Sequence, residues 1–185
     1  MGQALYDLKN MNIKRQLYLL LLSLFQLIFR LTPSNYLRIN LLRLSGCSIG
    51  INNFISNKVR FEFPWRLEIG NNNYISDNVY LDCRGGFIKI GNDNDISMEA
   101  ILFTLSHEIN SPHFSVKKGN ITIGSRVWVC ARSIITPAIN ISDGVVVASN
   151  SVLRSSTIKN SLYSGVPCKF VKKLSDKRSL NVRSA

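Results

Sequence analysis

The sequence between residues 49 and 97 contains one phrase three times: IGINNFIS at 49–56, IGNNNYIS at 69–76 and IGNDNDIS at 90–97. In each copy two aliphatic residues stand six positions apart. The same step continues later in the chain, without a break, through Ile123, Val129, Ile135, Ile141, Val147 and Leu153. A period of six fits neither an α-helix nor an alternating strand. It is typical of short strands wound into a coil, in which every sixth side chain points inward and successive coils stack.

Three such hexads make one triangular coil of about eighteen residues. The predicted inward positions are mostly Ile, Leu or Val, and Phe61 is the exception. Four positions after the first inward residue of each early coil stand Asn53, Asn73 and Asn94, which we expect to stack as a ladder of amides. The residues in excess of eighteen must bulge out at corners, near 63–68, 84–89 and 108–120. The inward positions are 49, 55, 61, 69, 75, 81, 90, 96, 102, 123, 129, 135, 141, 147 and 153.

The repeat predicts an all-β domain, a parallel β-helix of about five triangular coils, with helical and basic segments around it. We expect a helix over about 12–31, because proline disfavours helix at Thr32, and a second, short helix over about 35–45. The chain then divides into an N-terminal helical segment (1–46), with a loose start over 1–11, the β-helix (47–158) and a polar, basic C-terminal tail (159–185). Crossovers between parallel strands are right-handed in nearly all proteins, so this argument alone favours a right-handed coil.

The chain is strongly basic, with 23 Lys and Arg against 11 Asp and Glu, a net charge of +12. The basic residues concentrate in 14–43 and 154–183, while the repeat is close to neutral. This distribution favours anionic partners such as lipid headgroups or a phosphorylated small molecule. It argues against nucleic acid, for which no binding motif is present either.

Cysteine and histidine usage gives no metal site. The four cysteines have no paired spacing, and the chain has only two histidines, so we expect no metal and reduced thiols that pack as small apolar groups in a cytoplasmic protein. The cysteines are Cys47, Cys83, Cys130 and Cys168.

The stretch 17–29 is almost wholly apolar, but it is shorter than the ~20 residues that span a bilayer, and we expect no cleavable signal peptide. Two interpretations remain open. The helix packs against the rest of the protein or a neighbouring subunit. Alternatively, it lies in a membrane interface, peripheral to the inner face of the cytoplasmic membrane. Basic side chains would then meet anionic headgroups, namely Lys14, Arg15, Arg30, Arg38 and Arg43.

Four motifs accompany the hexads: LLRLSGCSIG at 41–50, LSHE at 105–108 followed by SPHF at 111–114, IGSRVWVCA at 123–131, and GVPCK at 165–169. With them the chain resembles the hexapeptide-repeat acyltransferases. The resemblance covers roughly residues 40–173 and is strongest to the colanic-acid and O-antigen type of sugar O-acetyltransferase, related to the maltose and galactoside acetyltransferases. It implies a left-handed β-helix, a homotrimer with active sites between subunits, and acetyl-CoA as co-substrate.

The resemblance implies that His107 is the general base, and neutral imidazole suits the deprotonation of a sugar hydroxyl. Glu108 would hold the ring or touch the acceptor, or it is only a solvated charge at a corner. Asp82 matches a position that faces the acceptor in sugar-acetylating relatives. His113 is either an acceptor contact or a plain loop residue.

For the cofactor, the resemblance places Trp128 beside the groove that holds the pantetheine arm and the backbone N–H of Ala131 near the thioester oxygen. Many relatives have Ser at this position, and Ala131 lacks its hydroxyl. Ser149 matches a small residue that contacts the cofactor on the next coil. Basic residues would meet the nucleotide phosphates, namely Lys169, Lys172 and, as a looser match, Arg154; for Lys172, plain solvation is a rival interpretation.

The resulting prediction is an acetyl-CoA-dependent O-acetyltransferase acting on a sugar of a bacterial surface polysaccharide or its lipid-linked precursor, by direct attack without an acyl-enzyme. An N-acetyltransferase on an amino sugar shares the fold and the histidine, and stays open. A non-catalytic β-helix scaffold would have no need of His107 or Trp128. A γ-type carbonic anhydrase needs three histidines for zinc, and the chain has two.

Overall fold

The computed structural model describes residues 13–175, apart from the side chains of Lys14 and Arg15. The loose start expected over 1–11 lies outside the described residues, as does 176–185. Two helices, α2 (Ile13–Leu31) and α3 (Asn35–Leu44), precede a left-handed β-solenoid of about five turns. The sequence prediction of a left-handed β-helix with an N-terminal helical segment is confirmed, so the right-handed coil that the crossover rule alone favours is not the one adopted.

The solenoid has three parallel faces, which we call A, B and C in chain order. Face A contains β1 (Ser48–Ile49), β4 (Leu67–Ile69), β7 (Ile88–Ile90), β12 (Ile121–Ile123) and β15 (Asn140–Ile141). Face B contains β2 (Phe54–Ile55), β5 (Tyr74–Ile75), β8 (Asp95–Ile96), β13 (Trp128–Val129), β16 (Val146–Val147), β18 (Ser161–Gly165) and β19 (Cys168–Lys173). Face C contains β3 (Arg60–Glu62), β6 (Tyr80–Asp82), β9 (Ile101–Phe103), β14 (Ile134–Ile135) and β17 (Val152–Leu153).

The core has the hexad period predicted from the sequence. Each of the fifteen inward positions is buried, from Ile49 and Ile55 in the first coil to Leu153 in the last. The faces are in register from coil to coil: Ile69 pairs with Ile90, for example, and Ile123 with Ile141. One apolar column per face therefore runs the length of the solenoid.

The amide ladder is also present. The Asn73 Nδ2 donates to Asn53 Oδ1 at 3.0 Å, and the Asn94 Nδ2 donates to Asn73 Oδ1 at 2.9 Å. The same oxygens accept the backbone N–H groups of Asn73 and Asn94, and Asn94 Oδ1 accepts that of Val127. All three amides are buried, so the ladder satisfies backbone groups at a corner that a straight strand pairing would leave without partners.

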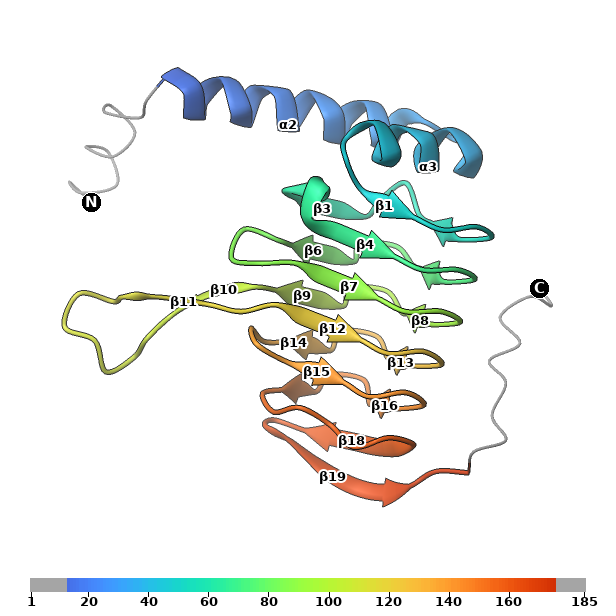
Figure 1. The fold of residues 1–185 in the computed structure, drawn as a ribbon, viewed down its shortest axis with the longest axis vertical. Helices are drawn as coiled ribbons and strands as arrows, with labels where there is room; N and C mark the ends of the chain where they lie inside the picture. Colours follow the sequence, from blue (N-terminus) through green and yellow to red (C-terminus); the bar gives the residue numbers. More distant parts are fainter. Residues whose placement is uncertain (1–12, 176–185) are drawn as a thin grey trace.

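Helix α2 lies across the N-terminal end of the solenoid (Figure 1). Phe29 is fully buried and meets the Phe61 ring edge-on at 5.1 Å, and the Gln26 amide donates to the Phe61 carbonyl at 3.2 Å. This face of α2 covers core side chains of the first coil that would otherwise meet water. The interpretation that the 17–29 helix packs on the protein is thus correct for one face of the helix.

Arg38 holds the two helices to the first coil. Its guanidinium donates to the carbonyls of Thr32, Pro33 and Ile55 at 3.0, 2.6 and 2.9 Å. The side chain is buried, and burial lowers its pKa. Arg38 is therefore a structural residue, and the expectation that it would meet lipid headgroups is wrong.

The bulges fall where the sequence predicts them. The first contains a short 3₁₀ helix, η1 (Pro64–Arg66), and the longest is a projecting arm. The arm begins as β10 (Leu105–His107), which pairs antiparallel with β11 (Val116–Lys118), and it extends far from the solenoid axis (Figure 1).

The C-terminal segment differs from the basic tail expected over 159–185. Residues 161–173 form the antiparallel hairpin β18–β19, which continues face B beyond β16. Tyr163 is buried there and continues the inward column of Val147. The basic residues of this segment stand on a strand because the alternate residues Ser161, Tyr163 and Cys168 complete the core.

Candidate functional site

His107 stands at the corner between faces C and A, at the end of β10, and its side chain is exposed. Its Nδ1 lies 2.6 Å from the carbonyl oxygen of Phe114, across the base of the arm. A carbonyl oxygen can only accept, so Nδ1 carries the proton and donates it to this bond. In the neutral ring Nε2 is then the unprotonated nitrogen, which can accept a proton from a substrate.

The arm that supplies this carbonyl is held by its own hydrogen bonds. The Glu108 N–H donates to the Ser115 carbonyl at 2.8 Å, and the Ser111 and Ser115 hydroxyls lie 2.7 Å apart. Phe114 has a left-handed backbone, with φ of 49°. These bonds fix the Phe114 carbonyl and, through it, the orientation of the His107 ring.

The other two predicted residues of the arm do not contact the His107 ring. Glu108 pairs with Lys117 at 3.2 Å, and both side chains are about half exposed, so the pair adds little stability. This geometry fits the interpretation of Glu108 as a solvated corner charge, while its part in catalysis stays a prediction. His113 is exposed on the arm.

Asp82 ends β6, one strand away from β9, which leads to His107. Its side chain is 2% exposed and makes a two-pronged ion pair with Arg84, whose Nη2 lies 2.6 Å from Oδ2. The Arg84 N–H also donates to Asp82 Oδ1 at 3.0 Å, and the pairing raises the pKa of the Arg84 guanidinium. An acceptor that reaches this site would therefore meet the Arg84 guanidinium, which is half exposed, together with the Asp82 carboxylate.

Sequence reasoning overlooked Arg84. The signal was available, because a charged residue precedes two glycines in the 84–89 bulge. The Gly85 N–H donates to the Thr104 hydroxyl at 2.9 Å, and a Cβ at Gly85 would lie 2.1 Å from the Thr104 carbonyl oxygen. The bulge thus lies directly against the stem of the arm that carries His107.

The predicted cofactor residues gather on face B and at its corner with face C. Trp128 on β13 is partly exposed, and its Nε1 donates to the Ser97 hydroxyl at 2.9 Å, which in turn donates to Asp95. Burial raises the pKa of Asp95. Ser97 is a second residue that sequence reasoning missed, and it fixes the indole ring against face B.

Trp128 and Lys172 belong to one row across face B. Trp128 pairs with Val146, Val146 with Leu162 and Leu162 with Lys172. Three strand spacings separate the ends of the row by about 14 Å, a length suited to an extended ligand with an anionic end. Lys169 lies on the same strand, β19, and both lysines are exposed.

Ala131 and Ser149 stack at the corner between faces B and C, where the Asn150 N–H donates to the Ala131 carbonyl at 3.1 Å. Within residues 13–175 the Ala131 N–H donates to no protein acceptor, so it is available to a ligand oxygen. Arg154 is exposed and follows β17 on face C, away from the row on face B.

The chain therefore brings the cofactor residues together but holds His107 apart from them. His107 is at the corner between faces C and A, Ala131 is at the corner between faces B and C, and the strands of face C lie between. One chain by itself does not assemble the whole predicted site.

The four cysteines are buried and free. Burial raises the pKa of Cys130 to about 11 and that of Cys83 to about 12, so these thiols are protonated at neutral pH and poor nucleophiles. In the described part of the chain, no group of three or more His, Cys, Asp or Glu side chains could hold a metal ion.

Comparison with known proteins adds a relative in sequence. The chain is 34% identical over 132 residues to a protein named as the colanic acid biosynthesis acetyltransferase WcaF of Escherichia coli K12, covering 71% of this chain and 72% of the relative. No family model matches the chain.

Solved structures share the fold. The hexapeptide-repeat acetyltransferase VCA0836 of Vibrio cholerae, in complex with acetyl-CoA, superimposes with a TM-score of 0.77 at 24% identity, over 84% of this chain and 86% of that one. AntD, an N-acyltransferase from Bacillus cereus in complex with dTDP and coenzyme A, gives a TM-score of 0.64 at 25% identity, over 71% and 75% of the two chains.

Proposed function

Because this chain belongs to the hexapeptide-repeat acetyltransferases, we propose that it transfers an acetyl group from acetyl-CoA to a sugar hydroxyl of a bacterial surface polysaccharide or its precursor. The relative named for colanic acid biosynthesis supports this acceptor class. The reduced, buried thiols and the use of acetyl-CoA agree with a cytoplasmic location.

The observation that carries the proposal is the hydrogen bond from His107 Nδ1 to the Phe114 carbonyl. It leaves Nε2 free to take the proton of the hydroxyl as the oxygen attacks the thioester carbonyl carbon. The tetrahedral intermediate collapses with loss of the CoA thiolate, which receives the proton from His107 Nε2. No acyl-enzyme is needed, in keeping with the buried, protonated cysteines.

For the cofactor, we assign the pantetheine arm to face B beside Trp128, the thioester oxygen to the Ala131 N–H, and the phosphates to Lys169 and Lys172. Backbone N–H groups without protein partners stabilise the charge that develops on such an oxygen. The row from Trp128 to Lys172 supports this direction along the face.

We further propose a homotrimer in which His107 of one subunit faces the cofactor row of its neighbour. The separation of His107 from Ala131 within one chain supports this arrangement. Two inactive variants, His107→Ala and Trp128→Ala, should recover activity when they are mixed after unfolding and refolding, because some interfaces then combine an intact histidine with an intact cofactor face. If the mixture recovers none, the site lies within one subunit.

The chemistry is tested by acetyl transfer to a panel of sugars, with release of the CoA thiol as the signal. His107→Ala should lower kcat by about 10²–10⁴-fold, the usual contribution of a general base, and leave CoA binding unchanged in calorimetry. His113→Ala is the matched control on the same arm. Equal rates for wild type and His107→Ala would refute the assignment of the base.

Binding is tested separately with Lys169→Ala and Lys172→Ala. Each should weaken CoA binding and leave binding of the phosphate-free pantetheine unchanged. If wild type binds no CoA although it is folded, the proposed function is wrong and the scaffold interpretation takes its place.

A second candidate, N-acetylation of an amino sugar, is favoured by the likeness to AntD. The two reactions differ in their products, since neutral hydroxylamine cleaves an ester and leaves an amide intact. A labile product would support O-acetylation, and a stable product from an amino sugar would support the second candidate.

A further inference from the structure

Helix α2 has two apolar faces, and only one of them packs on the protein. The packed face carries Tyr18, Leu22, Phe25 and Phe29, spaced three or four residues apart. On the opposite side lies an outward stripe with the same helical spacing. Its members are 47% to 81% exposed: Ile13, Leu17, Leu20, Leu21, Leu24, Leu27, Ile28 and Leu31.

The outward stripe contains no charged or polar side chain. A soluble domain rarely exposes so much contiguous apolar surface unless something binds there. No helix within residues 13–175 is long and apolar enough to cross a bilayer. The remaining occupants are a second protein surface, such as another copy of this chain, or the interfacial layer of a membrane.

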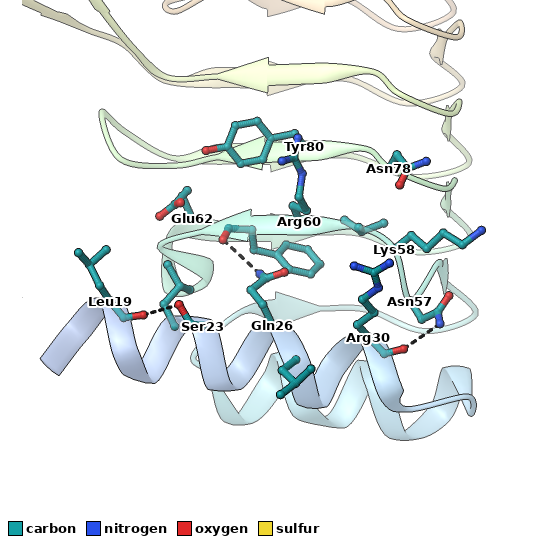
Figure 2. Close-up of a pocket in the computed structure, with 14 residues that line it drawn as sticks. Leu19, Ser23, Gln26, Arg30, Asn57, Lys58, Arg60, Glu62, Asn78 and Tyr80 are labelled. Carbon is teal, nitrogen blue, oxygen red and sulfur yellow. Dashed lines mark hydrogen bonds between the residues drawn. The ribbon is translucent and has the colours of Figure 1, made fainter. Parts of the chain in front are cut away.

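A groove beside the stripe points to the membrane. It lies between α2 and strands β3 and β6 and has a volume of about 580 Å³. Figure 2 shows Leu19, Ser23, Gln26 and Arg30 of the helix along one wall and Arg60, Glu62 and Tyr80 along the other. One wall is therefore helical and partly apolar, and the other carries charge.

The positive charge of the groove is not neutralised by the protein. Within the described residues, neither Arg30 nor Arg60 has an acidic partner within ion-pair distance, although Arg60 lies 4.8 Å over the Tyr80 ring. Lys58 is paired with Asp77. The one acid in the lining is Glu62, and burial raises its pKa, which weakens its negative charge.

We propose that α2 docks this protein on a membrane surface that contains anionic lipids. The outward stripe inserts among the upper acyl chains, and Arg30 and Arg60 bind the phosphates of lipids that lie beside the helix. An apolar helical face flanked by cations is the pattern of interfacial helices. The charge disfavours a second copy, because two chains of net charge +12 would bring their cationic grooves together.

This docking bears on the acceptor, a step that rests on the proposed function. Arg60 on β3 pairs with Tyr80 on β6, which pairs with Ile101 on β9, the strand that leads to His107. Two strand spacings amount to about 10 Å. The coil of His107 would thus lie close to the headgroup layer, where a sugar linked to a lipid phosphate is within reach.

The test uses the full chain and needs no enzymatic activity. Co-sedimentation is measured with vesicles of phosphatidylcholine alone and of phosphatidylcholine with phosphatidylglycerol. The stripe variant is Leu20→Gln/Leu24→Gln/Ile28→Gln, and the groove variant is Arg30→Gln/Arg60→Gln. The charge control, Lys159→Gln/Lys173→Gln, removes two positive charges at the opposite end of the solenoid.

Wild type should bind the anionic vesicles and bind phosphatidylcholine much less. A basic side chain near an anionic surface strengthens binding about fivefold, so the groove variant should bind about 25-fold more weakly. The stripe variant should lose binding, and the charge control should keep most of it. Circular dichroism checks that each variant is folded, which is expected because the stripe residues are exposed.

Three results would overturn the proposal. The first is no binding of folded wild type to anionic vesicles. The second is equal weakening by the groove variant and the charge control, which would show a diffuse charge effect. The third is a larger assembly of wild type that the stripe variant dissociates, which would make the stripe a contact between copies of the chain.

Discussion

The amide ladder makes a sharp prediction about stability. Asn73 is its middle rung: Nδ2 donates to Asn53 Oδ1 and to the Gly91 carbonyl, at 3.0 and 2.9 Å. Its Oδ1 accepts the Asn94 N–H at 3.1 Å and the Asn94 Nδ2 at 2.9 Å. Replacement by alanine removes all four hydrogen bonds from a site that is 2% exposed.

The loss leaves three buried groups without these partners: the Asn94 N–H, the Asn94 Nδ2 and the Gly91 carbonyl. A buried polar group without its hydrogen bond costs about 1–3 kcal/mol. Entry of a water molecule would recover part of the cost, so we expect Asn73→Ala to lower the free energy of unfolding by about 3–5 kcal/mol. Urea unfolding, followed by circular dichroism, measures this change.

The matched control is Asn57→Ala. Asn57 also donates to a carbonyl, that of Arg30 at 2.9 Å, but in an exposed position, so its loss should cost less than about 1 kcal/mol. The double variant Asn73→Ala/Asn94→Ala should be less destabilised than the sum of the single variants, because it also removes a stranded amide. A cost for Asn73→Ala no larger than that for Asn57→Ala would refute the reasoning.

Other features give shorter tests. Arg84→Ala should lower the free energy of unfolding by about 1–3 kcal/mol in urea titration, because it leaves the Asp82 carboxylate buried without its partner; Asp82→Asn in the same chain should restore part of the loss, and no restoration would argue against the pair. Gly85→Ala should lower kcat, since its Cβ would lie 2.1 Å from the Thr104 carbonyl oxygen and displace the stem of the arm; an unchanged kcat would show that the bulge does not position His107. The folded protein should resist alkylation at neutral pH, as measured by intact mass, whereas labelling of any cysteine without urea would contradict the burial of these thiols: Cys47, Cys83, Cys130 and Cys168.

Much of the fold was predictable because the hexad rule is local. Whether a side chain such as Ile75 or Val129 points inward depends on its place in a six-residue period, and the period is visible in one sequence. The ladder from Asn53 to Asn94 followed from the same register. Handedness did not follow from this period, and the resemblance to a known family supplied it.

The site was predictable in part. His107, Trp128 and Ala131 stand in short motifs, so their positions at corners could be inferred. The partner of Asp82 and the anchor of the Trp128 indole could not, because Arg84 lies in an irregular bulge and Ser97 belongs to the preceding coil. Such contacts depend on how one coil sits on the next, and no period in the sequence encodes them.

The sequence by itself determined the solenoid, its core positions and the corner on which His107 stands, because a repeated local pattern forces each coil to repeat the last. Only the tertiary structure decided the rest. It turned the ring of His107 toward the Phe114 carbonyl, drew the basic segment around Lys172 into face B and covered one of the two apolar faces of α2. These outcomes depend on contacts between segments distant in the chain, where shape and hydrogen-bonding partners, rather than composition, select which groups meet.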